Sequence, residues 1–361
     1  MTAQETARPE TFTLQEILRI DPRSSPSACA HVDYGNAVVS DRAVSTLSPP
    51  NGDGETRVEV FLFVQAIDRI DPAANSFRFQ GYGGMIWCDP RLSFDASEEG
   101  SDRRSFPAKA MLQDRGEIWW PGLILPTQLG EPEITNDRVI IFSDGTVEFQ
   151  TKVNTRLTAR YDFRMFPLDR QTLRIVLDTY PWRADGGRVL LTESTNRMGF
   201  DRRFEMAEWE LGKVDTGIGP AADPKFWMEI HVARRSGFYF WKIILPLVII
   251  VCVAWSTFWL TRDALAQRQR QVATAVLTLV AFQFAALGDL PRVPYLTIMD
   301  RVMLWSYIAV GATFISNVLS ARRYRKHSDL GLAFDRRGRW LYPLFYGTGL
   351  AAILIRYHFL S

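Results

Sequence analysis

The sequence predicts an all-β, immunoglobulin-like sandwich followed by a domain of four membrane-spanning helices. Three observations predict this fold class. The chain has 361 residues, and apolar runs dominate only after about Arg235. The first part contains short β-branched and aromatic runs separated by turn signals, which is typical of a sandwich. The second part contains four apolar stretches, each near the ~20 residues that a helix needs to cross a bilayer.

We expect three segments: an N-terminal extension over residues 1–56, the sandwich over 57–235 and the membrane domain over 236–361. In the extension, Thr13 and Glu16 form a capping box, which predicts a short helix over Thr13–Ile20. Residues 21–56 are rich in Pro, Ser, Gly and Asp, and we expect loop there. The first ten residues lack the apolar core of a signal peptide, so export would use a removed signal or the first span.

Turn signals separate the strands of the predicted sandwich. The sequence Ser143-Asp144-Gly145-Thr146 lies between two apolar runs, and Asp-Gly in that context is a strong hairpin signal. The predicted strands are Arg57–Ile67, Phe77–Trp87, Arg138–Phe142, Thr146–Leu157, Thr172–Asp178, Glu205–Leu211 and Lys225–Ala233.

Aromatic residues mark the ends of the predicted spans, as expected of interfacial belts. The spans cover about residues 238–260, 271–290, 302–320 and 340–360. Arginine and lysine cluster in the loops between the first and second spans and between the third and fourth, and such loops stay in the cytoplasm. We therefore expect a multi-pass protein of the cell (inner) membrane, with the sandwich and the C-terminus on the extracellular or periplasmic side.

Composition argues against several classes of function. A net charge of +2 does not suggest a nucleic-acid partner. Cys29, Cys88 and Cys252 are too few for a disulfide framework, and neither they nor the four scattered histidines have metal-site spacing. No nucleophile, acid pair or phosphate-binding motif stands out. We expect no catalytic residue, metal or cofactor, and therefore no enzyme.

The stretch Gln267–Pro294 is long enough to span a membrane but is not apolar all round. At helical spacing, one seam contains Gln267, Arg270, Thr274, Leu277, Ala281 and Phe284. Polar side chains at membrane depth normally face a bundle interior or a water-filled path, so several copies could turn this seam toward a wet axis. Alternatively, Thr274 and Thr278 bond back to their own helix and Gln283 packs against a neighbour.

The residues Tyr161–Leu173, read as YDFRMFPLDRQTL, resemble the signature loop of the pentameric ligand-gated ion channels. In animal members two cysteines bracket that loop. Here Ala159 and Leu173 stand at those places, so the chain resembles the prokaryotic branch, which lacks the disulfide. The resemblance covers about Arg57 to the C-terminus. Four further stretches resemble motifs of the family and occur in the order in which the family has them. They are Trp87–Leu92, Ile118–Pro121, Arg234–Pro246 and Asp289–Tyr295.

The resemblance implies a homopentamer around a central pore that is lined by five copies of Gln267–Gly288. Leu277, Ala281 and Phe284 would form apolar rings, and a narrow apolar ring blocks ions by dewetting. We expect Leu277 and Phe284 to form the closed gate. The alternative for Phe284 is packing against the neighbouring helix.

Ion selectivity has two open readings. Cation-conducting relatives carry an acidic ring at the cytoplasmic end of this helix, where this chain has Gln267, followed by Arg268 and Arg270. A ring of arginines repels cations and attracts anions. The resemblance to bacterial members favours cation conduction, whereas Arg268 and Arg270 favour anion conduction. Arg270 could instead extend its guanidinium to the membrane interface.

The resemblance also implies a ligand site between neighbouring sandwiches, in an aromatic box. By position the candidates are Tyr82, Trp120, Asp178, Tyr180, Trp182, Phe226 and Trp227. Aromatic faces attract ammonium groups, so a small amine is the first candidate ligand and the proton the second. The alternative is that Trp182, Phe226 and Trp227 belong to the sandwich core.

Coupling from sandwich to pore would pass through loops at the membrane surface. Asp71, Asp169 and Arg234 match an ion-pair cluster of the family, and such pairs are strong when partly buried. Phe166 and Pro167 would press on the loop that contains Pro291, Arg292 and Pro294. The alternative is that this cluster only holds the fold.

The function expected from the sequence is therefore that of a ligand-gated ion channel, with itself, the bilayer, inorganic ions and an amine or proton as partners. The rival is a membrane-tethered ligand sensor that does not conduct. The polar part of the seam speaks against this rival, because a plain anchor needs no such seam.

Overall fold

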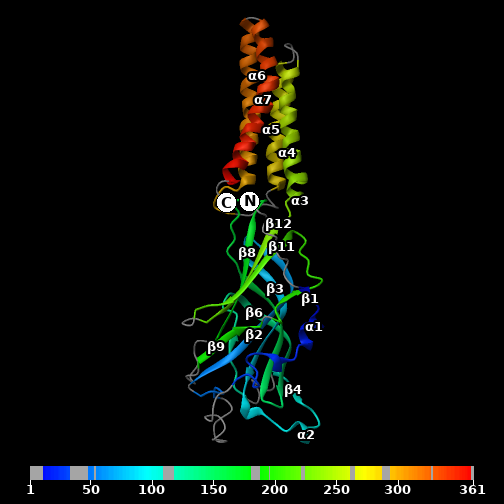
Figure 1. Cartoon of the computed structure of the whole chain (residues 1–361). Helices are drawn as coiled ribbons and strands as arrows, with labels where there is room; N and C mark the ends of the chain where they lie inside the picture. Colours follow the sequence, from blue (N-terminus) through cyan, green and yellow to red (C-terminus); the bar gives the residue numbers. More distant parts are fainter. Residues whose placement is uncertain are drawn as a thin grey trace. The chain divides into compact units, whose positions relative to one another are not determined.

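The structure, a computed structural model, describes residues 11–32, 48–52, 54–108, 118–179, 188–194, 196–220, 224–260, 265–286, 293–326 and 328–358. The chain divides into two compact units. The first consists of Met1–Tyr161 with Gln171–Val232, and the second of Asp162–Arg170 with Ala233–Ser361. The first contains the strands and the second contains the long helices (Figure 1). The signature loop thus belongs with the helices, although the sequence placed it in the sandwich.

Two β-sheets form the first unit. The larger has the strand order β1-β10-β2-β3-β7-β6-β4, with β9 also paired to β2, and the smaller has the order β11-β12-β8-β5. The strands are β1 (Thr11–Phe12), β2 (Glu55–Asp71), β3 (Ser76–Cys88), β4 (Arg103–Pro107), β5 (Leu123–Ile124), β6 (Gln128–Phe142), β7 (Thr146–Thr158), β8 (Arg170–Thr179), β9 (Arg188–Glu193), β10 (Gly199–Asp201), β11 (Trp209–Ile218) and β12 (Phe226–Arg234).

Alternating side chains of the two sheets build one apolar core between them. Val58, Val60 and Trp87 enter it from the larger sheet, and Leu173 and Ile230 from the smaller. The predicted hairpin is confirmed, since β6 and β7 pair across the Asp144-Gly145 turn. Gly145 adopts a φ of 90°, a left-handed conformation that glycine tolerates best. The observed strands extend several of the predicted ones, and β11 begins later than expected.

The N-terminal extension covers the outer face of the larger sheet. Its capping box is confirmed: α1 (Leu14–Arg19) begins after Thr13, whose side chain and that of Glu16 bond reciprocally to the backbone. Downstream, Ser25 donates to the buried carboxylate of Glu59 on β2. Covalent attachment follows at Cys29, which forms a disulfide with Cys88 at the end of β3. The sequence analysis predicted no disulfide framework and did not foresee this single disulfide, because residues 59 apart in sequence are brought together by the covering extension.

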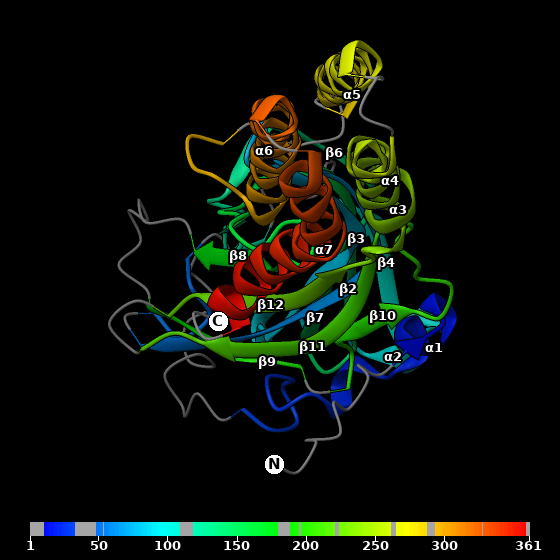
Figure 2. The same ribbon diagram turned by 90° about the horizontal axis from the view of Figure 1, so that it is seen from above.

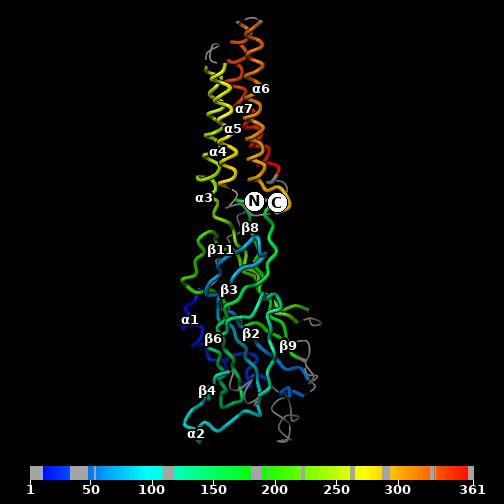
Figure 3. Tube along the Cα trace, turned by 180° about the vertical axis from the view of Figure 1, so that it is seen from behind, coloured from blue at the N-terminus to red at the C-terminus, as the bar shows by residue number. Residues whose placement is uncertain are grey.

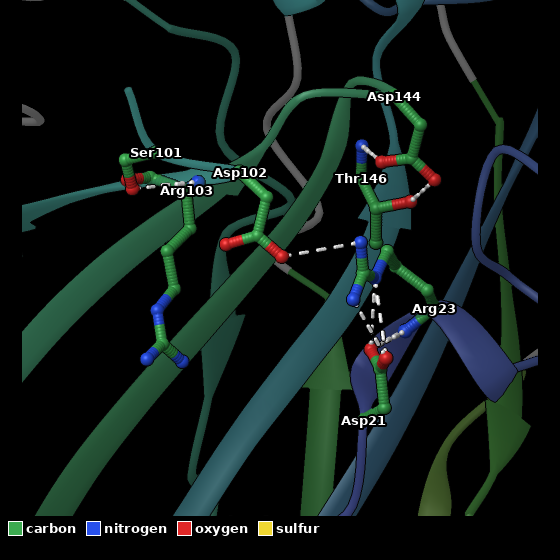
Figure 4. A network of polar contacts seen from close by, with 7 residues as sticks. All are labelled: Asp21, Arg23, Ser101, Asp102, Arg103, Asp144 and Thr146. Carbon is green, nitrogen blue, oxygen red and sulfur yellow. Dashed lines mark hydrogen bonds and ion pairs between the residues drawn. The ribbon is translucent and has the colours of Figure 1, made fainter. Parts of the chain in front are cut away.

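A polar network fastens the same segment to the end of the sheet (Figure 4). Arg23 forms ion pairs with Asp21 and, at 3.4 Å, with Asp102. Hydrogen bonds from Arg23 hold the pKa of the Asp21 carboxyl below its ordinary value. Nearby, Asp144 accepts bonds from the backbone and hydroxyl of Thr146. Because the Arg23 pairs are substantially exposed, they contribute only about 0–1 kcal/mol each and serve mainly to fix the position of the extension.

The second unit is a bundle of helices. They are α3 (Gly237–Tyr239), the π-helix η5 (Phe240–Ile244), α4 (Leu245–Trp255), the 3-10 helix η6 (Ser256–Trp259), α5 (Leu265–Ala286), α6 (Ile298–Lys326) and α7 (Ser328–His358). By length and composition, the stretches Gly237–Trp259 and Ile298–Arg325 are apolar enough to cross a membrane among the described residues. The helices α5 and α7 have 22 and 31 residues, but within their described residues neither contains a stretch as apolar as these two.

The basic segment between the third and fourth predicted spans is mostly helical rather than a loop. The helix α6 continues to Lys326, and α7 begins at Ser328, well before the predicted residue 340. A hydropathy window detects only the apolar part of a helix, whereas Arg, Lys, Leu and Ala all favour helix. Figure 3 shows α6 and α7 running side by side as two long helices.

Within this bundle, α5 packs against α4 and α6, and α7 packs mainly against α6. Seen along the helices, α5 stands at the edge of the bundle opposite α7 (Figure 2). One face of α5 is therefore open in the single chain.

Candidate pore, coupling loop and ligand surface

The open face of α5 is the predicted seam. All six seam residues are exposed in the single chain, namely Gln267, Arg270, Thr274, Leu277, Ala281 and Phe284. Leu277 and Phe284 are 70% and 71% exposed. Val272, Ala275 and Leu279 lie on the packed face and are buried. A helix at membrane depth that exposes both arginine and large apolar side chains on one face calls for a partner or a water-filled space there.

The alternative interpretation of the polar residues, in which they bond within the chain, also agrees with observed contacts. The hydroxyl of Thr274 donates to the carbonyl of Arg270, and that of Thr278 to the carbonyl of Thr274. Gln283 accepts a 2.6 Å bond from the hydroxyl of Tyr307 on α6. These bonds satisfy the hydroxyls without turning the seam inward, so they do not exclude a pore.

Arg268 and Arg270 have different environments, although they are only two positions apart. Arg268 is 3% exposed, and its Nη2 donates to Asp335 Oδ2 on α7 at 2.8 Å. The same nitrogen donates to the carbonyl of Leu260. The carboxylate of Asp335 also accepts bonds from Ser320 and Tyr324. The guanidinium of Arg268 is therefore buried away from the seam and paired, whereas Arg270 lies on the exposed face.

The signature loop carries the second candidate site. The carboxylate of Asp169 accepts bonds of 2.8 and 3.3 Å from the guanidinium of Arg234, at the end of β12. The side chains of Asp169 and Arg234 are 0% and 5% exposed. The backbone N–H of Arg234 also donates to the carbonyl of Asp169. The loop is thus locked to the chain segment that leads into the first helix.

Aromatic contacts surround this ion pair. Phe166 is buried, with its ring edge-to-face against Tyr239 of α3 at 4.8 Å between centroids. The guanidinium of Arg234 lies over both rings. Pro167 follows Phe166 through a cis peptide bond and is also buried. The sequence analysis did not single out Tyr239 as a coupling residue.

The other end of the signature loop contacts the segment before α6. The backbone N–H of Phe163 donates to the hydroxyl of Tyr295 at 3.0 Å, and the N–H of Ile298 donates to the carbonyl of Arg164. The guanidinium of Arg164 lies 5.9 Å from the Tyr295 ring centroid. One short loop therefore bonds to Arg234 at the end of β12, packs on Tyr239 at the start of the first helix, and bonds to the segment that leads into α6.

The remaining coupling residues are placed as follows. Pro294 is exposed. Its neighbour Tyr295 forms the hydrogen bond to the signature loop, and the sequence analysis did not single out this residue. Pro291 and Arg292 lie outside the described residues. Asp71 belongs to the other compact unit, where its carboxylate accepts bonds from the N–H groups of Ala73 and Ala74.

Two of the ligand candidates sit side by side on β12 but point to opposite faces. Phe226 is fully buried between the sheets, which agrees with the alternative that it belongs to the sandwich core. We therefore no longer propose it as a ligand-binding residue. Trp227 points outward, because strand side chains alternate. The guanidinium of Arg174 lies 5.8 Å from its ring centroid.

The other candidates lie on the two sheets and on the segment that precedes β5. Tyr82 on β3 has the Lys152 ammonium 5.8 Å from its ring centroid. Asp178 on β8 forms a 3.2 Å ion pair with Lys225. Trp120 is half-buried, edge-to-face with Trp87 and Phe149. Tyr180 and Trp182 lie outside the described residues.

Comparison with known proteins identifies the same two parts. Residues 42–219 match the model of the neurotransmitter-gated ion-channel ligand binding domain, and residues 243–329 match that of the neurotransmitter-gated ion-channel transmembrane region. A proton-gated ion channel of Gloeobacter violaceus is 23% identical over 270 residues, which cover 72% of this chain and 71% of the relative. Ligand-gated ion channel 50 of Caenorhabditis elegans is 24% identical over 337 residues, which cover 88% of this chain and 66% of the relative.

Proposed function

The chain belongs to the neurotransmitter-gated family of pentameric ligand-gated ion channels, and we propose that five copies of it surround a central pore lined by α5. The observation that carries this proposal is the open seam: every residue that the periodicity assigned to the pore is exposed on the face of α5 opposite its packed face. Four spans per chain, formed by α3–η6, α5, α6 and α7, would place the sandwich outside and the basic ends of α6 and α7 inside.

In this arrangement Leu277 and Phe284 form the closed gate. Five copies of each large apolar side chain would narrow the axis and leave no polar group to replace the hydration of an ion. Arg270 lies two helical turns before Leu277 on the same seam, near the cytoplasmic end. With Arg268 paired to Asp335, Arg270 is the charged residue that the described part of α5 presents on the seam, and it would bias the sign of the charge at that end.

Replacing Arg270 with glutamine is expected to shift the reversal potential away from the anion equilibrium value. Five guanidinium groups at a constriction repel cations, and glutamine removes the charge while preserving much of the length. The measurement is current across a planar bilayer under a salt gradient. Arg322→Gln, an exposed arginine on α6, is the charge-matched control. An unchanged reversal potential for Arg270→Gln would rule out the arginine ring as the selectivity element.

For the ligand we propose a small amine bound near the outward aromatic faces of Tyr82 and Trp227, with Trp120 and Asp178 nearby in the assembled site. The contacts that support this are cation–π contacts within the chain: Lys152 lies over Tyr82 and Arg174 over Trp227. A ring that attracts a lysine ammonium attracts an amine ligand for the same reason. The proton is the second candidate, supported by the proton-gated relative.

The cationic side chains that already lie over these rings would compete with an amine ligand for them, and this competition can be tested. Lys152→Met is expected to strengthen amine activation between about twofold and thirtyfold, because cation–π contacts contribute ~0.5–2 kcal/mol and each 1.4 kcal/mol is tenfold. Tyr82→Ala is expected to weaken it. Lys213→Met, on β11 and paired with Asp215, is the control. Identical amine dose–response curves in all four proteins would leave the proton as the ligand.

A further inference from the structure

The N-terminal extension covers a second buried layer, which lies outside the core between the two sheets. Phe61 and Phe63 on β2 and Ile86 on β3 are 1% exposed or less, although they alternate with residues that face that core. We call residues 11–32 the strap. Ile17, on the strap helix α1, is also fully buried. The strap therefore occupies the place that solvent would otherwise have on this face of the larger sheet.

Non-covalent contacts hold the strap along this face. The buried guanidinium of Arg197 lies over the ring of Phe61 and donates to the carbonyl of Ile20 on the strap. Further along the strap, the hydroxyl of Ser25 donates to the carboxylate of Glu59 on β2. Contacts of this kind open and close at equilibrium in local fluctuations of a folded protein.

One covalent link, the Cys29–Cys88 disulfide, closes the strap onto the end of β3. Beside it, the backbone N–H of Cys29 donates to the hydroxyl of Thr146 at 3.0 Å. The two cysteines differ in access: Cys88 is fully buried, whereas Cys29 is half-buried and is followed by the exposed Ala30. Because access decides which sulfur of a disulfide a thiolate attacks, a reductant in solution attacks Cys29.

The face of β3 that the strap covers also carries a candidate ligand residue. Cys88, Ile86 and Tyr82 stand at alternate positions of this strand, and all three point away from the core between the sheets. Across the ladder, Tyr82 pairs with the buried Phe63 on β2. The aromatic layer beneath the strap thus reaches the ring that we assigned to the amine, so loosening the strap changes the packing beside that ring.

We propose that the Cys29–Cys88 disulfide is a redox-controlled clasp, through which a dithiol reductant opens the strap and regulates the amine site at Tyr82. One thiolate of the reductant attacks the sulfur of Cys29, and Cys88 leaves as a thiolate. The second thiol of the reductant then attacks the mixed disulfide, which releases Cys29 and leaves the reductant as a cyclic disulfide. Two electrons pass to the protein, and each cysteine takes up one of the two protons that the reductant loses. The regulation of Tyr82 rests on the amine site proposed above, whereas the opening of the strap does not.

The first test follows the strap in the purified full-length protein, with and without dithiothreitol. Alkylation by iodoacetamide and mass spectrometry should find a label on each cysteine of the clasp after reduction, and hydrogen–deuterium exchange of residues 14–28 should become about fivefold faster or more. Cys29→Ser combined with Cys88→Ser should exchange like the reduced protein in both conditions, and Cys252→Ser should respond like wild type. The reduced wild-type protein gives the same comparison if the double variant does not assemble. Unchanged exchange after both cysteines are labelled would overturn the proposal, and so would a disulfide that dithiothreitol does not reduce in the folded protein.

The second test follows the regulation, as current across a bilayer activated by ethylamine. Reduction is expected to raise the half-maximal ethylamine concentration about fivefold, the lower end of the coupling usual between two sites, and to leave the double cysteine variant unaffected. An unchanged dose–response curve, in a protein that conducts and whose strap has opened, would overturn the regulation of the amine site. If neither redox state conducts while reduction still accelerates exchange in the strap, the clasp is supported and the channel function proposed above is contradicted.

Discussion

Asp169→Asn is expected to destabilise the helical unit by about 3–5 kcal/mol, the usual cost of removing one partner from a buried ion pair. Arg234 would keep its charge in a site where its side chain is only 5% exposed. Two bonds to the guanidinium would be lost or weakened, and the cation that lies over Phe166 would lose the carboxylate of Asp169. The measurement is thermal or denaturant unfolding of the purified protein in detergent.

Asp162→Asn is the matched control for this prediction. Asp162 lies in the same loop, but its pair with Arg164 is 3.8 Å long and both side chains are mostly exposed. The control should therefore change stability by less than about 1 kcal/mol. Equal effects of the two substitutions would mean that the Asp169–Arg234 pair is not the anchor of the loop.

The same variant separates a coupling role from a purely structural one. The loop bonds both to Arg234, before the first helix, and to Tyr295, after α5. If it transmits ligand binding to the pore, Asp169→Asn that still assembles should need more ligand for half-maximal current. Normal gating by an assembled Asp169→Asn channel would assign the cluster to the fold alone.

Asp335→Asn is the second change with a large expected effect, again about 3–5 kcal/mol. Asp335 is 2% exposed and gathers Arg268, Ser320 and Tyr324, so its charge links α5, α6 and α7 at one end of the bundle. The asparagine would leave the Arg268 guanidinium buried with a neutral partner. Unfolding of the purified protein, compared with wild type, gives the magnitude.

The control is the double variant Arg268→Gln with Asp335→Asn, in which neither charge remains. Neutralising a buried pair together usually costs much less than breaking it, because no unpaired charge stays behind. We expect the double variant to recover at least half of the stability lost by Asp335→Asn. A double variant as unstable as the single one would show that the hydrogen bonds to Ser320 and Tyr324, rather than the pair, hold this end of the bundle.

The comparison of Arg268 with Arg270 illustrates how far the sequence could be read. Helical periodicity placed Arg270 on the seam correctly, since its face depends only on spacing. The sequence contained the partner of Arg268, but Asp335 is 67 residues away on a segment predicted to be a loop. Spacing also puts Arg268 on the face of Val272 and Ala275, but its pairing with Asp335 could be assigned only once α7 was known to begin at Ser328.

Local signals elsewhere were read reliably. The capping box at Thr13 and the Asp-Gly turn at Gly145 each depend on a few neighbouring residues, and both formed as predicted. Features made by distant residues were missed, because no local pattern encodes them. Examples are the Cys29–Cys88 disulfide and the bond from Phe163 to Tyr295. Phe226 and Trp227 show an intermediate case: both are aromatic, and only the strand register decides which one faces outward.

The measurement that tests the central claim most directly is current across a bilayer that holds the purified protein, under a salt gradient, while pH is stepped and small amines are added. The protein is first verified as a pentamer. We predict a gated current whose reversal potential changes when Arg270 on the exposed face of α5 is replaced by glutamine. The absence of current under every condition, from a verified pentamer, would contradict the channel and favour a membrane-tethered sensor.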